Sequence, residues 1–399
     1  MTHVLPFSGL RILDISQGIA GPYCTQILWQ QGAEVIKVEP PEGDWGRNVG
    51  VVRDQHSALS ISYNAGKQGI CIDARQDAGK QLLRRLALQA DVVVQNFRPG
   101  VAERLGVGYA ALAADKPELI YVSISGYGND GPYAQAPASD SVMQADAGLM
   151  FANQDAEQTP RRIGLLLADI STALYAAQQT AAALYQRAVS GCGAHLQLSL
   201  FEACAALQIN DMAAFTLAQG RPAGAVSAPN GVFATADGQL SVLALNDDQF
   251  ARLCRALDRP AWLADPRLDS NEKRMAQRDY LHGELAAQLR QAPSSTWETR
   301  FKQHDVLHAV VRDYDALAAH PQAAHLGLLQ PLQQPGVGAL RLPGLPGAGK
   351  HRPLQPAPAI GQHTVAVLAQ AGLDEDDIAG LLNAAVVRQA DGVPDTRPA

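Results

Sequence analysis

The chain has 399 residues, of which 47% are hydrophobic and 18% charged, a composition typical of a globular protein with room for two domains. Its formal net charge of −7 excludes the broad basic surface of nucleic-acid-binding proteins, although a small polyanion can still bind locally. The five cysteines are scattered and none forms a CxxC pair, so we expect reduced thiols and neither a disulfide framework nor a metal site.

The N-terminal residues 1–16 lack a basic region followed by a long apolar stretch, and no later segment reaches the apolar length of a membrane span. We therefore expect no export signal, no membrane partner and a cytoplasmic location.

Apolar strands and helices alternate over the first 126 residues. Strands are expected at 10–16, 33–39, 69–74, 91–97 and 118–126, and helices at 21–32 and 76–90. The strands are apolar on both faces, which is typical of a parallel sheet covered on both sides, and consecutive parallel strands need right-handed crossovers. This order predicts an α/β fold with an open, doubly wound, mostly parallel, Rossmann-like sheet.

Three glycine-containing loops follow these strands and would lie at the carboxyl edge of the sheet, where α/β proteins bind ligands. They read SQGIAGP (16–22), QNFRPG (95–100) and SGYGNDGPY (125–133). The first has the spacing G-x-x-G rather than the G-x-G-x-x-G of dinucleotide sites, which argues against an NAD dehydrogenase. Each loop is equally acceptable as an ordinary strand-to-helix turn.

One isolated carboxylate stands in the segment GLLLADISTALYAAQQTAAAL (164–184). Between Arg162 and Arg187, Asp169 is the only residue that carries a charge at neutral pH. Its plainest role is a helix N-cap, which contributes about 1 kcal/mol. A lone acid beside an apolar run is also a candidate functional group.

The pattern of predicted secondary structure changes after residue 220. Residues 231–245 predict a hairpin that turns at Asp237-Gly238, and Asn246 is a plausible cap for a helix over 246–258. Helical segments follow to about 318, residues 331–358 are rich in Pro and Gly with room for one short hairpin, and 363–387 return to helix before a loose tail. We expect a large α/β domain over 1–220, a smaller α+β domain over 221–330, and a linker with C-terminal helices over 331–399 that packs back on the large domain.

Several motifs in this order resemble the family III CoA-transferases, which are related to the α-methylacyl-CoA racemases. They are residues 10–47, NAGKQGICIDAR (64–75), QNFRPGVAERLG (95–106), SISGYGNDGPY (123–133), DSVMQADAGLM (140–150), Asp169 with its helix, DPRLDSNEKR (265–274) and PAIGQHT (358–364). The resemblance runs over nearly the whole chain. It implies a homodimer of interlocked chains, with acyl-CoA and a carboxylic acid as substrates and no metal.

The resemblance implies that Asp169 is the nucleophile. Asp169 would attack the donor thioester to give a mixed anhydride, and the CoA thiolate would return to form an aspartyl-CoA thioester that the acceptor acid then attacks. The helix N-terminus favours the ionised carboxylate that this chemistry needs, whereas burial among leucines favours the neutral acid. The sequence leaves open which effect prevails.

The same resemblance assigns binding residues. The CoA site would be lined by Gln17, Gly18, Ile19, Ala20, Asn96, Phe97, Arg98 and Arg104, with Lys67 and Arg75 as nearby cations. The acyl pocket would be lined by Tyr127, Gly128, Asp140 and Gln144. Solvated surface charges at Lys67 and Arg75, a core position for Phe97, and buried structural roles for Asp140 and Gln144 are the alternatives.

Two departures from relatives bear on function. The glycine run that covers the active site of formyl-CoA transferase is missing, and residues 222–232 are the nearest candidate for that loop. The segment that carries the racemase histidine reads QAPASDSVM, without a histidine, which argues against two-base proton transfer. We therefore expect a CoA-transferase that acts on a small dicarboxylate, with succinyl-CoA as a possible donor; the alternatives are an acyl-CoA racemase and a non-catalytic acyl-CoA-binding protein.

Overall fold

The computed structural model describes residues 5–155, 157–221, 224–347 and 352–390. The chain divides into a large unit, formed by residues 1–212 and 328–399, and a small unit, formed by residues 213–327. Of the loop candidate 222–232, residues 222 and 223 lie outside the described ranges.

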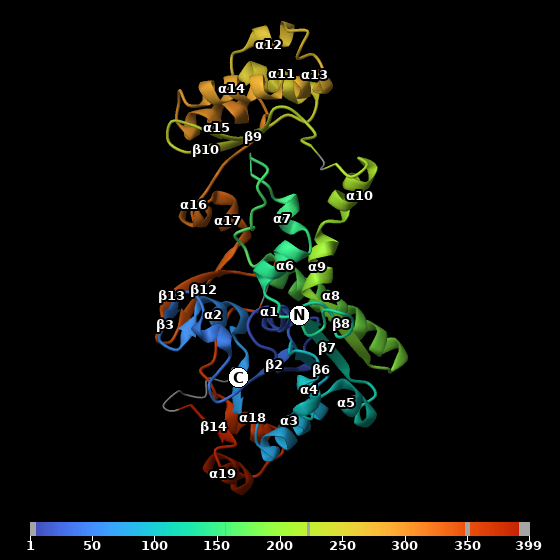
Figure 1. Cartoon of the computed structure of the whole chain (residues 1–399). Helices are drawn as coiled ribbons and strands as arrows, with labels where there is room; N and C mark the ends of the chain where they lie inside the picture. Colours follow the sequence, from blue (N-terminus) through green and yellow to red (C-terminus); the bar gives the residue numbers. More distant parts are fainter. Residues whose placement is uncertain (1–4, 156, 222–223, 348–351, 391–399) are drawn as a thin grey trace. The chain divides into compact units, whose positions relative to one another are not determined.

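A seven-stranded sheet forms the centre of the large unit, in the order β14-β5-β2-β1-β6-β7-β8 (Figure 1). The strands are β1 (Arg11–Asp14), β2 (Glu34–Glu39), β5 (Gln68–Ile72), β6 (Val92–Gln95), β7 (Ile120–Ser125), β8 (Ala194–Ser199) and β14 (Val387–Arg388). Every neighbouring pair is parallel except β14 with β5. The predicted mostly parallel α/β sheet is thus confirmed.

Two separate cores cover the two faces of this sheet, as strands with apolar residues on both faces require. Ile12 and Val92 pack with helices α1 (Ala20–Gln30), α8 (Leu167–Ser190) and α9 (Leu200–Leu207). Their strand neighbours Leu13 and Val93 face the opposite core, with α3 (Asp77–Gln89), α5 (Tyr109–Asp115) and α18 (Thr364–Gln370). The sheet is therefore doubly wound, and its order reverses between β1 and β6.

Shorter elements of the large unit connect these layers. They are η1 (Trp45–Asn48), β3 (Val52–Arg53), β4 (His56–Ser57), α2 (Ala58–Asn64), α4 (Val101–Arg104), α6 (Asp140–Asp146), α7 (Leu149–Ala152), β12 (Leu329–Gln334), β13 (Gly338–Pro343) and α19 (Glu375–Asn383). Strands β12 and β13 pair as the short hairpin expected in the Pro/Gly-rich stretch. Helix α10 (Ile209–Leu217) runs across the boundary between the two units.

Strands β8 and β14 and the start of helix α8 differ from the sequence expectation in the large unit. Strand β8 was not predicted, because its polar residues obscure the apolar pattern on the edge of the sheet. Strand β14 falls at the end of a region expected to be helical; Ala385, with φ of 50°, lies between α19 and this strand. Helix α8 begins at Leu167 with Leu166 as its N-cap, so the expectation that Asp169 caps this helix is wrong.

The small unit contains a three-stranded antiparallel sheet, in the order β11-β10-β9, packed with helices. Its elements are β9 (Asn230–Ala234), β10 (Gln239–Leu243), α11 (Asp247–Ala256), α12 (Pro260–Ala264), α13 (Asn271–Ala276), α14 (Arg278–Leu289), α15 (Ser294–Gln303), β11 (Leu307–Val310), α16 (Tyr314–Ala318) and α17 (Pro321–Leu326). The Asp237-Gly238 hairpin and the Asn246 cap, which accepts from the Gln249 N–H at 2.9 Å, are confirmed. Strand β11 interrupts the helical segments that the sequence predicted up to about 318.

Three further properties concern the described residues alone. All five cysteines are free thiols. No described helix combines the length and apolar character needed to cross a membrane. Within the same ranges, no group of three or more His, Cys, Asp or Glu side chains is placed to hold a metal ion.

Candidate active site

A cavity of about 840 Å³ opens at the carboxyl edge of the sheet, where the order of strands reverses. Its size is in the range of roughly 300–1,000 Å³ that is usual for ligand sites. All three glycine-containing loops contribute to it. The lining residues are Gln17, Ile19, Ala20, Trp45, Val49, Gly50, Val51, Ala58, Leu59, Asn96, Phe97, Arg98, Pro99, Ile124, Ser125, Gly126, Ala134, Ala136, Ala138, Ser139, Asp140, Ser141, Leu166, Asp169 and Leu200.

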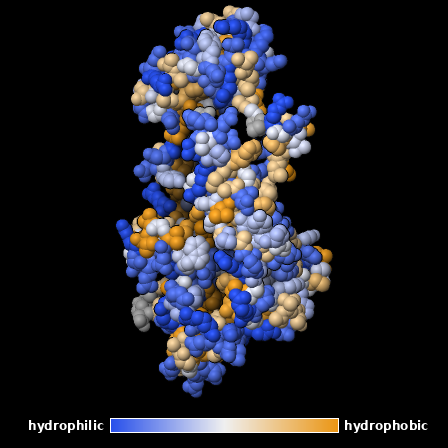
Figure 2. Space-filling view, in the orientation of Figure 1, coloured by the Kyte–Doolittle hydropathy of each residue, from blue (hydrophilic) through white to orange (hydrophobic). Residues whose placement is uncertain are grey.

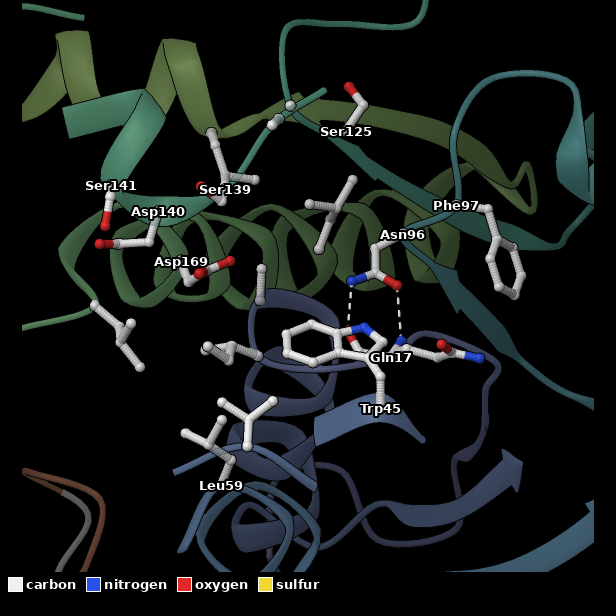
Figure 3. Close-up of a pocket in the computed structure, with 18 of the residues that line it drawn as sticks. Gln17, Trp45, Leu59, Asn96, Phe97, Ser125, Ser139, Asp140, Ser141 and Asp169 are labelled. Carbon is white, nitrogen blue, oxygen red and sulfur yellow. Dashed lines mark hydrogen bonds between the residues drawn. The ribbon is translucent and has the colours of Figure 1, made fainter. Parts of the chain in front are cut away.

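Asp169 is the third residue of α8, and its carboxylate opens into this cavity beside Asp140 of α6 (Figure 3). Burial, followed by the negative charge of Asp140, raises the pKa of Asp169 from 3.8 to about 7. Burial thus prevails over the helix N-terminus. A carboxyl group with this pKa is about half ionised at neutral pH, which suits a nucleophile or a general base.

Asp140 caps helix α8 from outside the helix. One carboxylate oxygen, Oδ1, accepts from the Ala168 N–H at 2.8 Å, and the other, Oδ2, accepts from Gln144 Nε2 at 2.7 Å. Gln144 is fully buried and also donates to the Leu165 carbonyl at 3.0 Å. Asp140 lines the cavity, whereas Gln144 lies behind it and holds Asp140 and the chain that leads into α8.

The loops after β1 and β6 are bonded to each other. Asn96 Oδ1 accepts from the Gln17 N–H, and Asn96 Nδ2 donates to the Gln17 carbonyl, both at 2.7 Å. Ile19 and Ala20 line the cavity at the start of α1. Gly18 lies behind this surface with φ of +77°, and its N–H donates to Asp44. The structure therefore brings Gln17, Ile19, Ala20 and Asn96 together at the cavity, and their binding of CoA stays a prediction.

Arg98 and Phe97 also line the cavity, and the Arg98 side chain is exposed. Arg98 is the one basic residue among the described lining residues. Arg104 is exposed on α4 and does not line the cavity. It lies close to the same loop, because a Cβ placed on Gly100 would be 3.4 Å from Arg104 Nη1.

The other two expected cations are not at the cavity. Lys67 is buried, and its ammonium bonds to Asp14 Oδ2 at 2.9 Å, to the Pro22 carbonyl at 2.8 Å and to Thr25 Oγ1 at 2.7 Å. Such an ammonium has no surface left for a phosphate, so we correct the expectation and assign Lys67 a structural role. Arg75 is exposed and pairs with Asp73 at 2.7 Å, so it remains a surface charge.

Tyr127 and Gly128 do not line the cavity either. The Tyr127 hydroxyl donates to Asp146 Oδ2 at 2.8 Å, and the Gly128 N–H donates to Ser125 Oγ at 3.0 Å. The lining positions are Ser125 and Gly126, directly at the end of β7. The lining residues of this loop therefore lie two positions before the ones that the resemblance implied.

A further wall was missed by sequence reasoning. Trp45 of η1 has half of its surface exposed, and Val49, Val51 and Leu59 extend the apolar surface beside it. Trp45 stands in the motif EGDWGR, where glycine and aspartate indicate a turn. The presence of this aromatic residue inside a turn motif is the feature of the sequence that could have indicated the wall.

Comparison with known proteins adds independent findings. The model of CoA-transferase family III matches residues 7–364. The human succinyl-CoA:glutarate CoA-transferase is 32% identical over 98% of this chain and 91% of its own length. The succinyl-CoA–D-citramalate CoA-transferase of Chloroflexus aurantiacus is 31% identical over 94% of this chain and 96% of its own length. A crystal structure of a CAIB/BAIF family protein from Brucella suis superposes with a TM-score of 0.84 at 30% identity, over 92% of this chain and 100% of that one.

Proposed function

The chain belongs to family III of the CoA-transferases and is such an enzyme, and from this premise we propose that it transfers CoA covalently through Asp169. The observation that carries the proposal is a buried carboxylate of raised pKa that opens into the cavity from the first turn of α8. CoA thioesters are the substrates of this CoA-transfer reaction.

In the first half of the reaction, an Asp169 oxygen attacks the thioester carbonyl of the donor. The C–S bond breaks, the CoA thiolate leaves with the electron pair, and an aspartyl mixed anhydride forms. The thiolate then attacks the Asp169 carbonyl carbon of this anhydride, which releases the donor acid as a carboxylate and leaves an aspartyl-CoA thioester.

In the second half, the acceptor carboxylate attacks the aspartyl-CoA thioester and again expels the CoA thiolate. The thiolate attacks the acceptor carbonyl of the new anhydride, so acceptor-CoA leaves and the Asp169 carboxylate is restored. No net proton is consumed. Apolar lining by residues such as Leu166 and Leu200 limits the water that would otherwise hydrolyse these intermediates.

For the substrates, we propose a small dicarboxylate acceptor and succinyl-CoA as donor. Relatives named for succinyl-CoA with glutarate and with D-citramalate support this class, and an acetyl-CoA:oxalate CoA-transferase of Acetobacter aceti is 33% identical over 81% of this chain and 85% of its own length. Incubation of the enzyme with a panel of acyl-CoA donors and acids, read by mass spectrometry of the CoA products, tests the assignment. Transfer only to monocarboxylates would contradict it.

Arg98 is expected to bind a CoA phosphate. Replacing it in Arg98→Ala should weaken CoA binding about 10- to 100-fold, because a charge-assisted hydrogen bond contributes roughly 1.5–3 kcal/mol. Arg104→Ala should have a smaller effect, and Arg75→Ala, which removes an exposed cation away from the cavity, should have none. Titration calorimetry measures all three. Equal affinities for Arg98→Ala and Arg75→Ala would show that the phosphate contacts lie elsewhere.

We also propose that the protein is a homodimer with interlocked chains. Two proline-rich passages lie near 221–229, at the start of the small domain expected from the sequence, and at 331–358, after the small unit; residues 222–223 and 348–351 lie outside the described ranges. Hydrophobic surface is visible over α9 and α10 (Figure 2). The exposed apolar residues of these two helices include Leu207, Ile209 and Met212. Light scattering at micromolar concentration should give twice the chain mass of 42.3 kDa. A mass of one chain would refute the dimer.

The racemase alternative needs a histidine and an aspartate as two bases, and none of the described lining residues is a histidine. A binding protein without turnover would not need the raised pKa of Asp169. Exchange of isotope-labelled CoA between thioesters separates transfer from both alternatives.

A further inference from the structure

A buried ion pair lies behind the cavity wall without lining the cavity. Lys37 of β2 and Asp44, the residue that caps η1, are 1% and 4% exposed at their side chains, and Lys37 Nζ is 3.0 Å from Asp44 Oδ2. The ammonium also donates to the carbonyl of Ser16, the residue before Gln17. Neither side chain faces the cavity, so neither touches substrate.

The Asp44 carboxylate joins two segments that are far apart in sequence. It accepts from the Gly18 N–H at 2.9 and 3.0 Å and from the Gly46 N–H at 2.8 Å. A Cβ on Gly18 would lie 2.0 Å from Trp45 Cζ2, so the indole ring rests directly against this glycine. The loop 17–20 and Trp45 therefore form one continuous wall, and both segments face the cavity.

A buried ion pair contributes little net stability to a fold. Desolvation of both charges offsets most of their attraction, so apolar residues of similar volume would often stabilise the fold as well. What apolar residues cannot do is accept two backbone N–H groups and donate to a backbone carbonyl on the loop that forms the site. The side-chain hydrogen bonds of this pair end on Ser16 and Gly18, on the Gly46 N–H beside Trp45, or on the partner ion. Lys37 Nζ also lies 3.9 Å from the buried Asp14 carboxylate, which keeps its own pair with Lys67.

We propose that Lys37 and Asp44 are positioning residues, which hold the loop 17–20 and the Trp45 ring in the geometry that presents the donor thioester to Asp169. The inference rests on the proposed function of this cavity. A loss of order at this wall misplaces the thioester carbonyl, and a misplacement of about 1 Å costs on the order of 100-fold in rate.

Lys37→Met should lower kcat about 10- to 100-fold at saturating donor. The assay temperature lies well below the melting temperature of the variant, so that the loss does not come from unfolding. In protein labelled with 5-fluorotryptophan, the fluorine resonance of Trp45, assigned with Trp45→Phe, should shift or broaden while that of Trp29, in the core, should not. The matched control is Arg274→Met, which removes a fully buried cation paired with Asp247 at 2.7 Å in the small unit. It should lower the melting temperature and leave both kcat and the Trp45 resonance unchanged.

If Lys37→Met does not fold, the double variant Lys37→Met/Asp44→Asn leaves no isolated buried charge, and it should show the same loss of kcat and the same change at Trp45. Either folded variant with kcat within twofold of wild type and an unchanged Trp45 resonance would overturn the positioning role. Failure of the wild type to form an acyl adduct at Asp169 would instead overturn the proposed function, and the Trp45 resonance would still report on the wall.

Discussion

Asp169→Asn is expected to abolish CoA transfer, with a fall in kcat of at least about 1,000-fold, while the protein stays folded. The amide is a far poorer nucleophile than the carboxylate, and it has nearly the same volume. Helix α8 should keep its start, because its external cap is Asp140 and Asp169 makes no capping bond. The measurement is transfer between acyl-CoA and acid, followed by chromatography of the CoA products.

A chemical trap locates the nucleophile directly. Wild-type enzyme incubated with acyl-CoA and then hydroxylamine should yield an aspartyl hydroxamate in the peptide that contains residue 169. Asp169→Asn should give none, and Asp146→Asn, which alters an exposed carboxylate on α6, should give the wild-type yield. A hydroxamate mapped to Asp140, or undiminished turnover in Asp169→Asn, would show that the mechanism is wrong.

The same variant should be more stable than wild type at alkaline pH. Because the pKa of Asp169 is raised in the folded protein, the folded state holds the proton more tightly than the unfolded chain does. The contribution of Asp169 to wild-type stability therefore falls as pH rises from 3.8 to about 7 and stays low above it. At pH 8, Asp169→Asn should gain as much as about 4 kcal/mol of unfolding free energy, and at pH 4 almost none. Urea unfolding at both pH values measures the difference.

Asp140→Asn is expected to move the pH dependence of transfer toward lower pH. With a pKa of about 7, only about one tenth of Asp169 is ionised at pH 6 and about nine tenths at pH 8, so wild-type kcat/KM should rise close to tenfold over this range. Removing the Asp140 charge lowers the pKa of Asp169, which leaves a larger ionised fraction at pH 6. The rise in kcat/KM should therefore become smaller.

Two comparisons separate the charge of Asp140 from its capping bond. The asparagine can still accept from the Ala168 N–H, whereas Asp140→Ala cannot and should lose about 1 kcal/mol of stability. Asp146→Asn, on the exposed side of the same helix, should reproduce the wild-type pH profile. An Asp140→Asn profile that coincides with wild type would mean that burial alone sets the pKa of Asp169.

Much of the fold and part of the site were accessible from the sequence. Strands such as 10–16 and 91–97 carry apolar residues on both faces, and this local pattern is sufficient to predict a covered parallel sheet. Since parallel strands place their carboxyl ends at one edge, the loops that contain Gln17, Asn96 and Arg98 could be expected to meet. The lone acid Asp169 was visible because its neighbours in sequence carry no charge.

Other properties depend on contacts between segments that are distant in sequence, which no local pattern records. Lys67 and Arg75 read alike as cations near the site, but only the tertiary structure shows that Lys67 is buried against Asp14, 53 residues away. The cap of α8 comes from Asp140, 28 residues before Ala168, so Asp169 is free of that role. The direction of the pKa shift of Asp169 likewise depends on tertiary packing, because desolvation depends on all the groups that surround the carboxylate.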